Sequence, residues 1–189
     1  MTAILITPKK FVDNRGWFSE TYSCAKYAKL GINALFCQDN HSLSVNAGTL
    51  RGIHFQHSPN AQAKLVRCVR GRISDVAVDL RPQSPTFLKW VAAELSVENG
   101  NQLFIPAGYG HAFLTLAENC EVEYKVDANY APQSDSGIRW NDPMLAISWP
   151  AVDGKPDEPT LSDKDRGLPL AKDLELNFPY DGRPLRPLV

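Results

Sequence analysis

A histidine stands in the middle of RGIHFQ (residues 51–56), a segment that otherwise has the composition of a β-strand. The neutral imidazole of His54 is a suitable general base near pH 7. Many strand histidines are only hydrogen-bonded core residues, but here Gly52 removes side-chain bulk, and Arg51 and Lys64 bring two cations into the same region. Burying such charges in a purely structural core is costly, so the grouping favours a functional pocket.

The spacing of Arg51 and His54 raises a geometric question. Regular strand alternation places residues three apart on opposite faces. Both side chains reach one pocket if the strand bulges near Gly52, or else they line different parts of a long cleft. The sequence leaves both alternatives open.

The elements that must position these residues are short strands. In CEVEYKV (120–126), alternate residues are apolar or aromatic and the others are charged, which turns Tyr124 inward. The same alternation turns Lys64 inward and puts Val76, Val78 and Leu80 on one side of a strand. Further strands are expected in KLVRCVRGRISDVAVDL, FLKWVAAELS, QLFIPAGYGHAFLTL and AISW. Many short strands separated by Gly and Pro predict an all-β sandwich, jelly roll or barrel.

Few helices are expected beside these strands. Only SCAKYAKLG (23–31) is typical of a helix, with Ser23 as a possible N-cap and Gly31 as the terminator. From about Pro150 the chain is rich in Pro and charge. We therefore expect residues 1–189 to form a single domain, with residues 150–189 as a C-terminal tail wrapped on its surface.

A second spacing specifies the barrel type. GNQLFIPAGYGH (100–111) resembles the second motif of the cupin β-barrels, so a cupin jelly roll with a few short peripheral helices is expected. The first cupin motif, G-x5-H-x-H followed by a glutamate, is incomplete: Gly48 and His54 fit, but Gln56 replaces the second histidine. His57 falls on the opposite face of the strand from His54. The sequence therefore predicts no metal site, with a metal-dependent cupin as an alternative.

Composition narrows the possible partners and location. With 20 Lys and Arg against 21 Asp and Glu, the net charge is −1, which argues against broad binding to nucleic acid or anionic membrane. The N-terminal apolar run is too short for a signal sequence, and no run has spanning length. A soluble cytoplasmic protein with reduced thiols is expected, because the four cysteines form no CxxC pair: Cys24, Cys37, Cys68 and Cys120.

Several segments, in unbroken order over roughly residues 9–170, together resemble the dTDP-4-dehydrorhamnose 3,5-epimerases of deoxysugar biosynthesis. The resemblance implies a metal-free cupin jelly roll without a cofactor, a homodimer, and a nucleotide-linked 4-keto-6-deoxyhexose as substrate. The segments are RGWFSETY, QDNHSLSVNAGTLRGIHFQ, AQAKLVRCVRGRISDVAVDLRPQSPTF, LFIPAGYGHAFLTL, VEYK, NYAPQSDSGIRWNDP and LSDKD.

The reaction explains the residue types. A C4 ketone acidifies the C3 and C5 hydrogens of the sugar, and inversion removes a proton from one face and returns one to the other. By the resemblance His54 is the base and Tyr124 the acid, while Lys64 stabilises the enolate. Asp165 of LSDKD matches the carboxylate that orients the base. Ser162 and Asp165 also fit a helix capping box, and Asp163 lies close enough to be confused with Asp165.

Substrate binding is assigned on the same grounds. Arginines are expected at the diphosphate, and a flat aromatic ring, Tyr130, is expected to stack on the thymine. RGWFSE is expected to be a strand exchanged with the partner subunit. The sequence does not decide whether C3, C5 or both are inverted, so a single-carbon epimerase or a 4-keto sugar isomerase are the related alternatives. The expected substrate-binding residues are Arg15, Glu20, Gln38, Asn40, Arg51, His111, Tyr130, Asp135 and Lys164.

Overall fold

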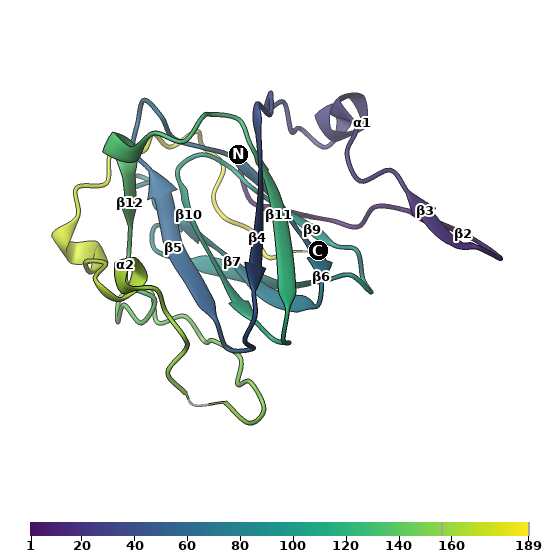
Figure 1. Cartoon of the computed structure of the whole chain (residues 1–189). Coiled ribbons are helices and arrows are strands. Elements are labelled where there is room, and N and C mark those ends of the chain that lie inside the picture. The colour runs from purple at the N-terminus through teal and green to yellow at the C-terminus, as the bar shows by residue number, and fades with distance from the viewer. Residues whose placement is uncertain (156, 189) are drawn as a thin grey trace.

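The computed structural model describes residues 1–155 and 157–188 and contains two antiparallel five-stranded sheets that face each other (Figure 1). Chain order alternates between the sheets from β4 to β7 and again from β8 to β12, as in a jelly roll, which confirms the all-β prediction. The first sheet has the order β1 (Ile4–Ile6), β9 (Gln102–Ile105), β6 (Lys64–Arg70), β11 (Cys120–Val126) and β4 (Gln38–Ser44). The second has the order β12 (Asp135–Gly137), β5 (Leu50–Gln56), β10 (Tyr109–Thr115), β7 (Arg72–Asp79) and β8 (Trp90–Ser96).

The space between the sheets is filled at one end by an apolar core. Val66 and Val122 of the first sheet and Ile73 and Leu95 of the second are buried in one cluster. Glu121, between two buried residues of β11, is partly exposed, as the alternation of CEVEYKV predicts. The alternating, inward-facing side chains of the strands are thus apolar at one end of the sandwich, where they form the core, and polar at the other end.

The outer face of the second sheet is covered by the chain that follows β12. Val76, Val78 and Leu80 lie on one side as predicted and are buried against residues such as Ile138 and Leu145. The strand expected at AISW (146–149) is wrong. The backbone is left-handed at the start of this segment, with φ of 44°, and its apolar side chains pack onto the sheet instead of extending it.

Short helices lie at the periphery. The predicted helix is confirmed as α1 (Cys24–Lys29), with Ser23 at the N-cap position but without a side-chain capping bond. Tyr27 of α1 packs with Leu65 and Phe104 on the outer face of the first sheet. The remaining helical turns are η1 (Pro132–Ser134), α2 (Asp163–Arg166) and η2 (Ala171–Asp173).

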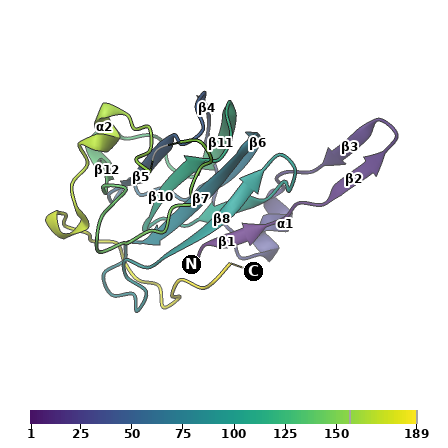
Figure 2. The same ribbon diagram turned by 90° about the horizontal axis from the view of Figure 1, so that it is seen from below.

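A two-stranded hairpin, β2 (Lys10–Asp13) and β3 (Gly16–Ser19), projects away from both sheets (Figure 2). It belongs to neither sheet of the sandwich. Its apolar side chains are more than half exposed: Phe11, Val12, Trp17 and Phe18. No helix among the described residues is long and apolar enough to cross a membrane.

The C-terminal segment contributes buried side chains. Phe178 is 2% exposed, meets Phe55 edge-on and lies parallel to the ring of His57, with ring centres 5.7 Å and 6.1 Å away. Leu185 joins the core between the sheets. Pro156 and Val189 of the predicted tail lie outside the described residues, and the single-domain organisation stays a prediction.

Replacing Phe178 by Ala tests how firmly this segment is anchored. Because the substitution empties a buried aromatic site against β5, we expect the free energy of unfolding to fall by about 3 to 5 kcal/mol. Urea denaturation measures it. Leu35→Ala, at a side chain that is 78% exposed, is the matched control and should change little. A loss below about 1 kcal/mol at Phe178 would mean that the segment is only loosely attached.

Candidate active site

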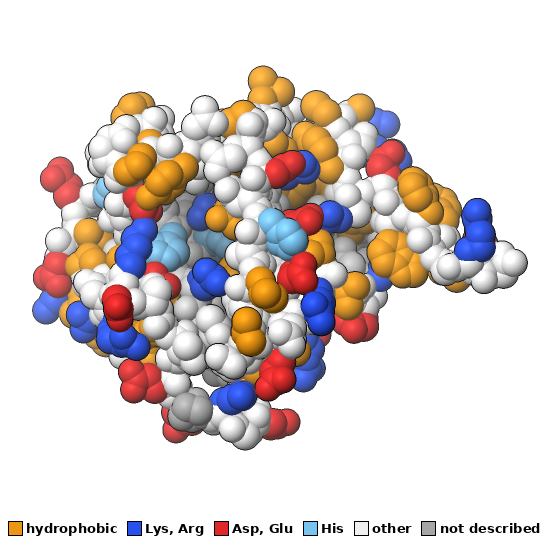
Figure 3. All heavy atoms as spheres, viewed as in Figure 1, with side chains coloured by type: hydrophobic (Ala, Val, Ile, Leu, Met, Phe, Trp, Pro, Cys, Tyr) orange, Lys and Arg blue, Asp and Glu red, His pale blue; other side chains and the backbone are white. Residues whose placement is uncertain are grey.

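A cleft of about 640 Å³ opens at the polar end of the sandwich. Figure 3 shows a hollow in this face that contains histidine side chains and is bordered by lysine and arginine side chains. The cleft is lined from both sheets, from the loop before β12 and from α2. All but two of the predicted site residues line it: Gln38, Asn40, Arg51, His54, Lys64, His111, Tyr124, Tyr130, Asp135, Lys164 and Asp165.

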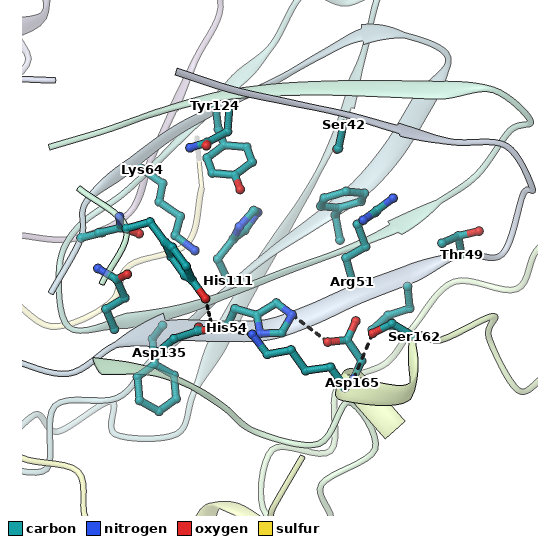
Figure 4. Close-up of a pocket in the computed structure, with 18 of the residues that line it drawn as sticks. Ser42, Thr49, Arg51, His54, Lys64, His111, Tyr124, Asp135, Ser162 and Asp165 are labelled. Carbon is teal, nitrogen blue, oxygen red and sulfur yellow. Dashed lines mark hydrogen bonds and ion pairs between the residues drawn. The ribbon is translucent and has the colours of Figure 1, made fainter. Parts of the chain in front are cut away.

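A bulge in β5 decides how Arg51 and His54 share the cleft. His54 pairs with His111 and Arg51 with Phe113, so three steps along β5 match two along β10. Gly52 lies within the bulge with φ of 120°, and a Cβ there would come within 2.6 Å of the His111 carbonyl oxygen. Only glycine fits this backbone, which brings both side chains to one face (Figure 4). Of the two alternatives, the bulge is therefore the one that the chain adopts.

His54 contacts a buried carboxylate on α2. Its Nε2 lies 2.8 Å from Oδ1 of Asp165, whereas its Nδ1 has no hydrogen-bonding partner among the described residues (Figure 4). Burial alone would raise the pKa of Asp165, but His54 and hydrogen bonds involving the Gly52 amide and Ser162 hold the pKa below its usual value. With its proton on Nε2, toward an ionised Asp165, the imidazole keeps a lone pair on Nδ1.

The two interpretations of Ser162 and Asp165 are compatible. Ser162 is the N-cap of α2, and its Oγ accepts a hydrogen bond from the Asp165 amide at 3.1 Å. The backbone of Asp165 thus serves the cap while its carboxylate faces His54. Asp163, the other carboxylate of LSDKD, is fully exposed and pairs with Arg166.

Tyr124 and Lys64 face His54 from the other sheet. Tyr124 is on β11 and Lys64 on β6, and the Lys64 Nζ lies 6.0 Å from the centre of the Tyr124 ring. Burial raises the pKa of Tyr124, against an opposing effect of Arg51, so the phenol keeps its proton at neutral pH. Burial lowers the pKa of Lys64 to about 8, although Asp75 and Asp135 favour the charged form.

A second histidine and carboxylate lie at the floor of the cleft. Nε2 of His111 is 2.7 Å from Oδ1 of Asp75, and both side chains are buried. Burial lowers the pKa of His111 despite Asp75, so its ring is neutral at pH 7. His111 also meets the Tyr124 ring edge-on, with centres 6.3 Å apart, which places it between the two sheets.

One end of the cleft carries an aromatic ring with charged neighbours. The Tyr130 hydroxyl donates to Oδ2 of Asp135 at 3.0 Å, and Lys164 forms an ion pair with the same carboxylate. Gln38 accepts a hydrogen bond from the Tyr130 amide at 3.2 Å and donates to Asn40 at 2.8 Å. The residues of the QDN and NYAPQSD segments are therefore adjacent in space.

Arg51 reaches the cleft from the bulge. It donates through Nε to Ser44 Oγ at 3.1 Å and through Nη2 to the Leu43 carbonyl at 3.0 Å. A guanidinium has five N–H donors, so the rest stay available to an anion.

Arg15 and Glu20 are the two predicted residues that do not line the cleft. Arg15 is at the tip of the projecting hairpin, is 85% exposed and pairs with Asp13. Glu20 follows β3 and pairs with Lys26. Among the described residues, no group of three or more His, Cys, Asp or Glu side chains could hold a metal ion.

Comparison with known proteins identifies the family of the chain. The family model described as dTDP-4-dehydrorhamnose 3,5-epimerase matches residues 2–173. The chain belongs to this family. The dTDP-4-dehydrorhamnose 3,5-epimerase of Sinorhizobium fredii is 48% identical over 176 residues, which are 93% of this chain and 88% of that protein.

Solved structures of the dTDP-4-dehydrorhamnose 3,5-epimerase family superpose closely. The enzyme from Bacillus anthracis, with TDP and PPi bound, has a TM-score of 0.83 at 49% identity and covers 88% of this chain and 92% of its own. RmlC from Legionella pneumophila, a dTDP-6-deoxy-D-glucose-3,5-epimerase in complex with dTDP-4-keto-L-rhamnose, has a TM-score of 0.84 at 41% identity. It covers 90% of this chain and 88% of that chain. These relatives confirm the cupin-like jelly roll that is expected of the family.

Sequence reasoning missed several polar residues at or beside this site, among them Asp75 and Gln56. Asp75 contacts His111, and Gln56 lines the cleft two residues beyond His54. A signal for Asp75 was present: in RISDVAVD it shares a strand face with Ile73 and Ala77, which line the core. A carboxylate on an apolar strand face requires a partner, and only the β7–β10 pairing identifies it.

The titration of Lys64 can be measured directly. Because burial disfavours its charged form, we expect Lys64 to lose its proton near pH 8, below the ordinary range of a lysine in water. NMR titration of isotope-labelled lysine side chains, with the signal assigned by Lys64→Met, tests this. A Lys64 signal that titrates with the exposed lysines would contradict the buried environment described here.

Proposed function

We propose that this chain converts dTDP-4-dehydro-6-deoxyglucose into dTDP-4-dehydrorhamnose by inverting C3 and C5 through an enolate. The product serves dTDP-L-rhamnose or related deoxysugar biosynthesis, and the free thiols accord with action in the cytoplasm. One observation carries the proposal in this family member: a carboxylate-bound histidine on the second sheet faces a protonated tyrosine on the first across a single cleft. Inversion needs a base and an acid on opposite faces of the sugar.

His54 removes the acidic proton beside the C4 ketone. The C–H bond breaks, its proton goes to the imidazole, and the electron pair moves onto the carbonyl oxygen as an enolate. Asp165 stabilises the resulting imidazolium at 2.8 Å and keeps the ring in place. Because Asp165 is buried and its amide is bonded to the Ser162 cap of α2, the carboxylate stays in place beside the ring during the transfer.

Lys64 stabilises the enolate oxygen. Its ammonium is buried in the cleft, where a low dielectric strengthens its attraction for a developing negative charge. His111 is neutral and lies between Tyr124 and His54 (Figure 4); with Nε2 directed at Asp75, its Nδ1 can accept one hydrogen bond without adding charge. The positive charge of Lys64 therefore provides most of the stabilisation of the enolate oxygen.

Tyr124 completes the inversion. Its hydroxyl gives a proton to the same carbon from the opposite face, the enolate returns to a ketone, and the phenolate regains a proton from solvent. Solvent also takes the proton from His54, so the protein ends in its starting state. Repetition at the second carbon requires the sugar to turn while the nucleotide stays bound.

The nucleotide is bound along the same cleft. Arg51 and Lys164 supply positive charge for the diphosphate, and Tyr130 offers a flat ring for the base. Gln38, Asn40 and Asp135 supply polar contacts. The proposed nucleotide-binding residues of the cleft are therefore Gln38, Asn40, Arg51, Tyr130, Asp135 and Lys164.

The proton-transfer roles are separated by isotope exchange in deuterated water. His54→Asn should abolish both deuterium entry and epimerisation. We expect the rate to fall by about a hundredfold to ten-thousandfold or more. Tyr124→Phe should still exchange deuterium, because His54 can remove and return a proton on one face, but the inverted product should hardly accumulate. Mass spectrometry and NMR at C3 and C5 measure both.

The same assay distinguishes the related functions. Exchange at one carbon only would indicate a single-carbon epimerase, and exchange at neither would contradict the proposed reaction. Assays with a chelator present, which should leave the rate unchanged, address a metal-dependent cupin. Normal inversion by Tyr124→Phe would assign the acid to another group.

We propose further that the enzyme is a homodimer in which the β2–β3 hairpin of one subunit reaches the cleft of the other. Four apolar side chains of the hairpin are exposed in the single chain, as for a surface that a partner covers. Arg15 and Glu20 lie on this arm, remote from their own cleft. In the partner's cleft Arg15 adds a cation for the diphosphate.

Mixing two inactive variants tests this exchange. If Arg15 acts on the partner's cleft, combining Arg15→Ala with His54→Asn subunits creates one intact site per mixed dimer, and activity should return after subunit exchange. Steady-state turnover measures it, and analytical ultracentrifugation confirms the dimer. If Arg15→Ala alone is inactive and mixing restores nothing, Arg15 does not act across the interface.

A further inference from the structure

Gln56 is buried beneath the loop that carries Tyr130, and its amide holds that loop on both sides of the ring. Its Oε1 accepts a hydrogen bond from the Ala131 amide at 2.8 Å. Its Nε2 donates to the carbonyl of Asn129 at 3.3 Å and to that of Asn60 at 2.6 Å. Only 4% of Gln56 is exposed, so its side chain has little room for other conformations.

The other contacts of Tyr130 complete this support. Gln38 accepts from the Tyr130 amide at 3.2 Å, and Asp135 accepts from the Tyr130 hydroxyl at 3.0 Å. Asp135 also pairs with Gln56 in the β5–β12 ladder. The ring itself remains open, since Tyr130 is 56% exposed. An exposed aromatic side chain on a loop has little packing to orient it, so the position of the Tyr130 ring depends on these hydrogen bonds.

We infer that Gln56 is a positioning residue that fixes the Tyr130 ring and thereby sets the affinity for the nucleobase. The inference rests on the proposed function, in which Tyr130 stacks on that base. The site requires a side-chain amide, because its oxygen accepts from one backbone N–H and its NH₂ group donates to two backbone carbonyls. Glutamate supplies only the acceptor, and methionine supplies neither.

Binding of dTDP to Gln56→Met measures the effect. Loss of the three hydrogen bonds leaves buried backbone groups unpaired and frees the loop. We therefore expect the Kd for dTDP, measured by calorimetry, to rise about tenfold, which is within the range for the loss of one base–aromatic stack. KM for the sugar nucleotide should rise with Kd while kcat stays within about twofold, because the proton-transfer groups are untouched. Gln56→Glu, which keeps the Ala131 bond, should lie between wild type and Gln56→Met and serves if the latter does not fold.

A double-mutant cycle separates positioning from general stability. In a Tyr130→Ala background Gln56→Met should change the Kd less than about twofold, since no ring remains to be placed. Gln102→Met is the matched control: Gln102 is equally buried and bonds to Tyr27 and Thr21 on the outer face of the other sheet. Its effect on dTDP binding should be the same with Tyr130 present or absent.

The outcomes divide clearly. An unchanged Kd for Gln56→Met, or a penalty just as large without the Tyr130 ring, would overturn the positioning role while leaving the proposed function intact. Failure of the wild-type protein to bind dTDP would instead overturn the proposed function and this inference with it. A tenfold loss that vanishes in the Tyr130→Ala background supports both.

Discussion

The bulge of β5 at Gly52 is the constraint on which the rest of the site depends. It turns Arg51 and His54 to one face of a strand that would otherwise separate them. The same glycine lets the strand approach β10 closely enough to pair His54 with His111, and its amide helps to hold the pKa of Asp165 below its usual value. A single backbone irregularity therefore positions the histidine, its carboxylate and the arginine together, without any of them lying on a flexible loop.

Burial gives the cleft residues different charges at one pH. Lys64 and His111 both have lowered pKa values, but Lys64 begins from a much higher value, so it remains largely charged at neutral pH while His111 is neutral. Asp165 is buried too, yet its hydrogen bonds outweigh desolvation and it stays ionised. One cation, one neutral imidazole and one carboxylate thus coexist in a small volume because each has a different balance of desolvation and partners.

The parts of this arrangement that follow from strand alternation could be predicted, and the parts that depend on pairing could not. Tyr124 and Lys64 point inward because their strands alternate regularly. Whether β5 bulged was undecided, because local sequence at Gly52 permits both geometries and the register against β10 selects one. The contact of Asp75 with His111 depends on register in the same way. At residues 146–149 the prediction failed because apolar residues suit a strand and a covering segment equally.

The two-sheet architecture suits a reaction that must act on both faces of one ring. A base and an acid on a single strand would approach the sugar from the same side, whereas β5 and β11 belong to opposing sheets and enclose it. Inverting two carbons in turn also requires the sugar to move relative to His54 and Tyr124 while the nucleotide stays in place. In the proposed mechanism the hydrogen bonds around Tyr130 meet this need, because the Tyr130 amide and hydroxyl and the Ala131 amide hold the loop at the nucleotide end and not at the reacting end. Rigidity at one end of the cleft and room at the other are therefore two requirements of the same chemistry.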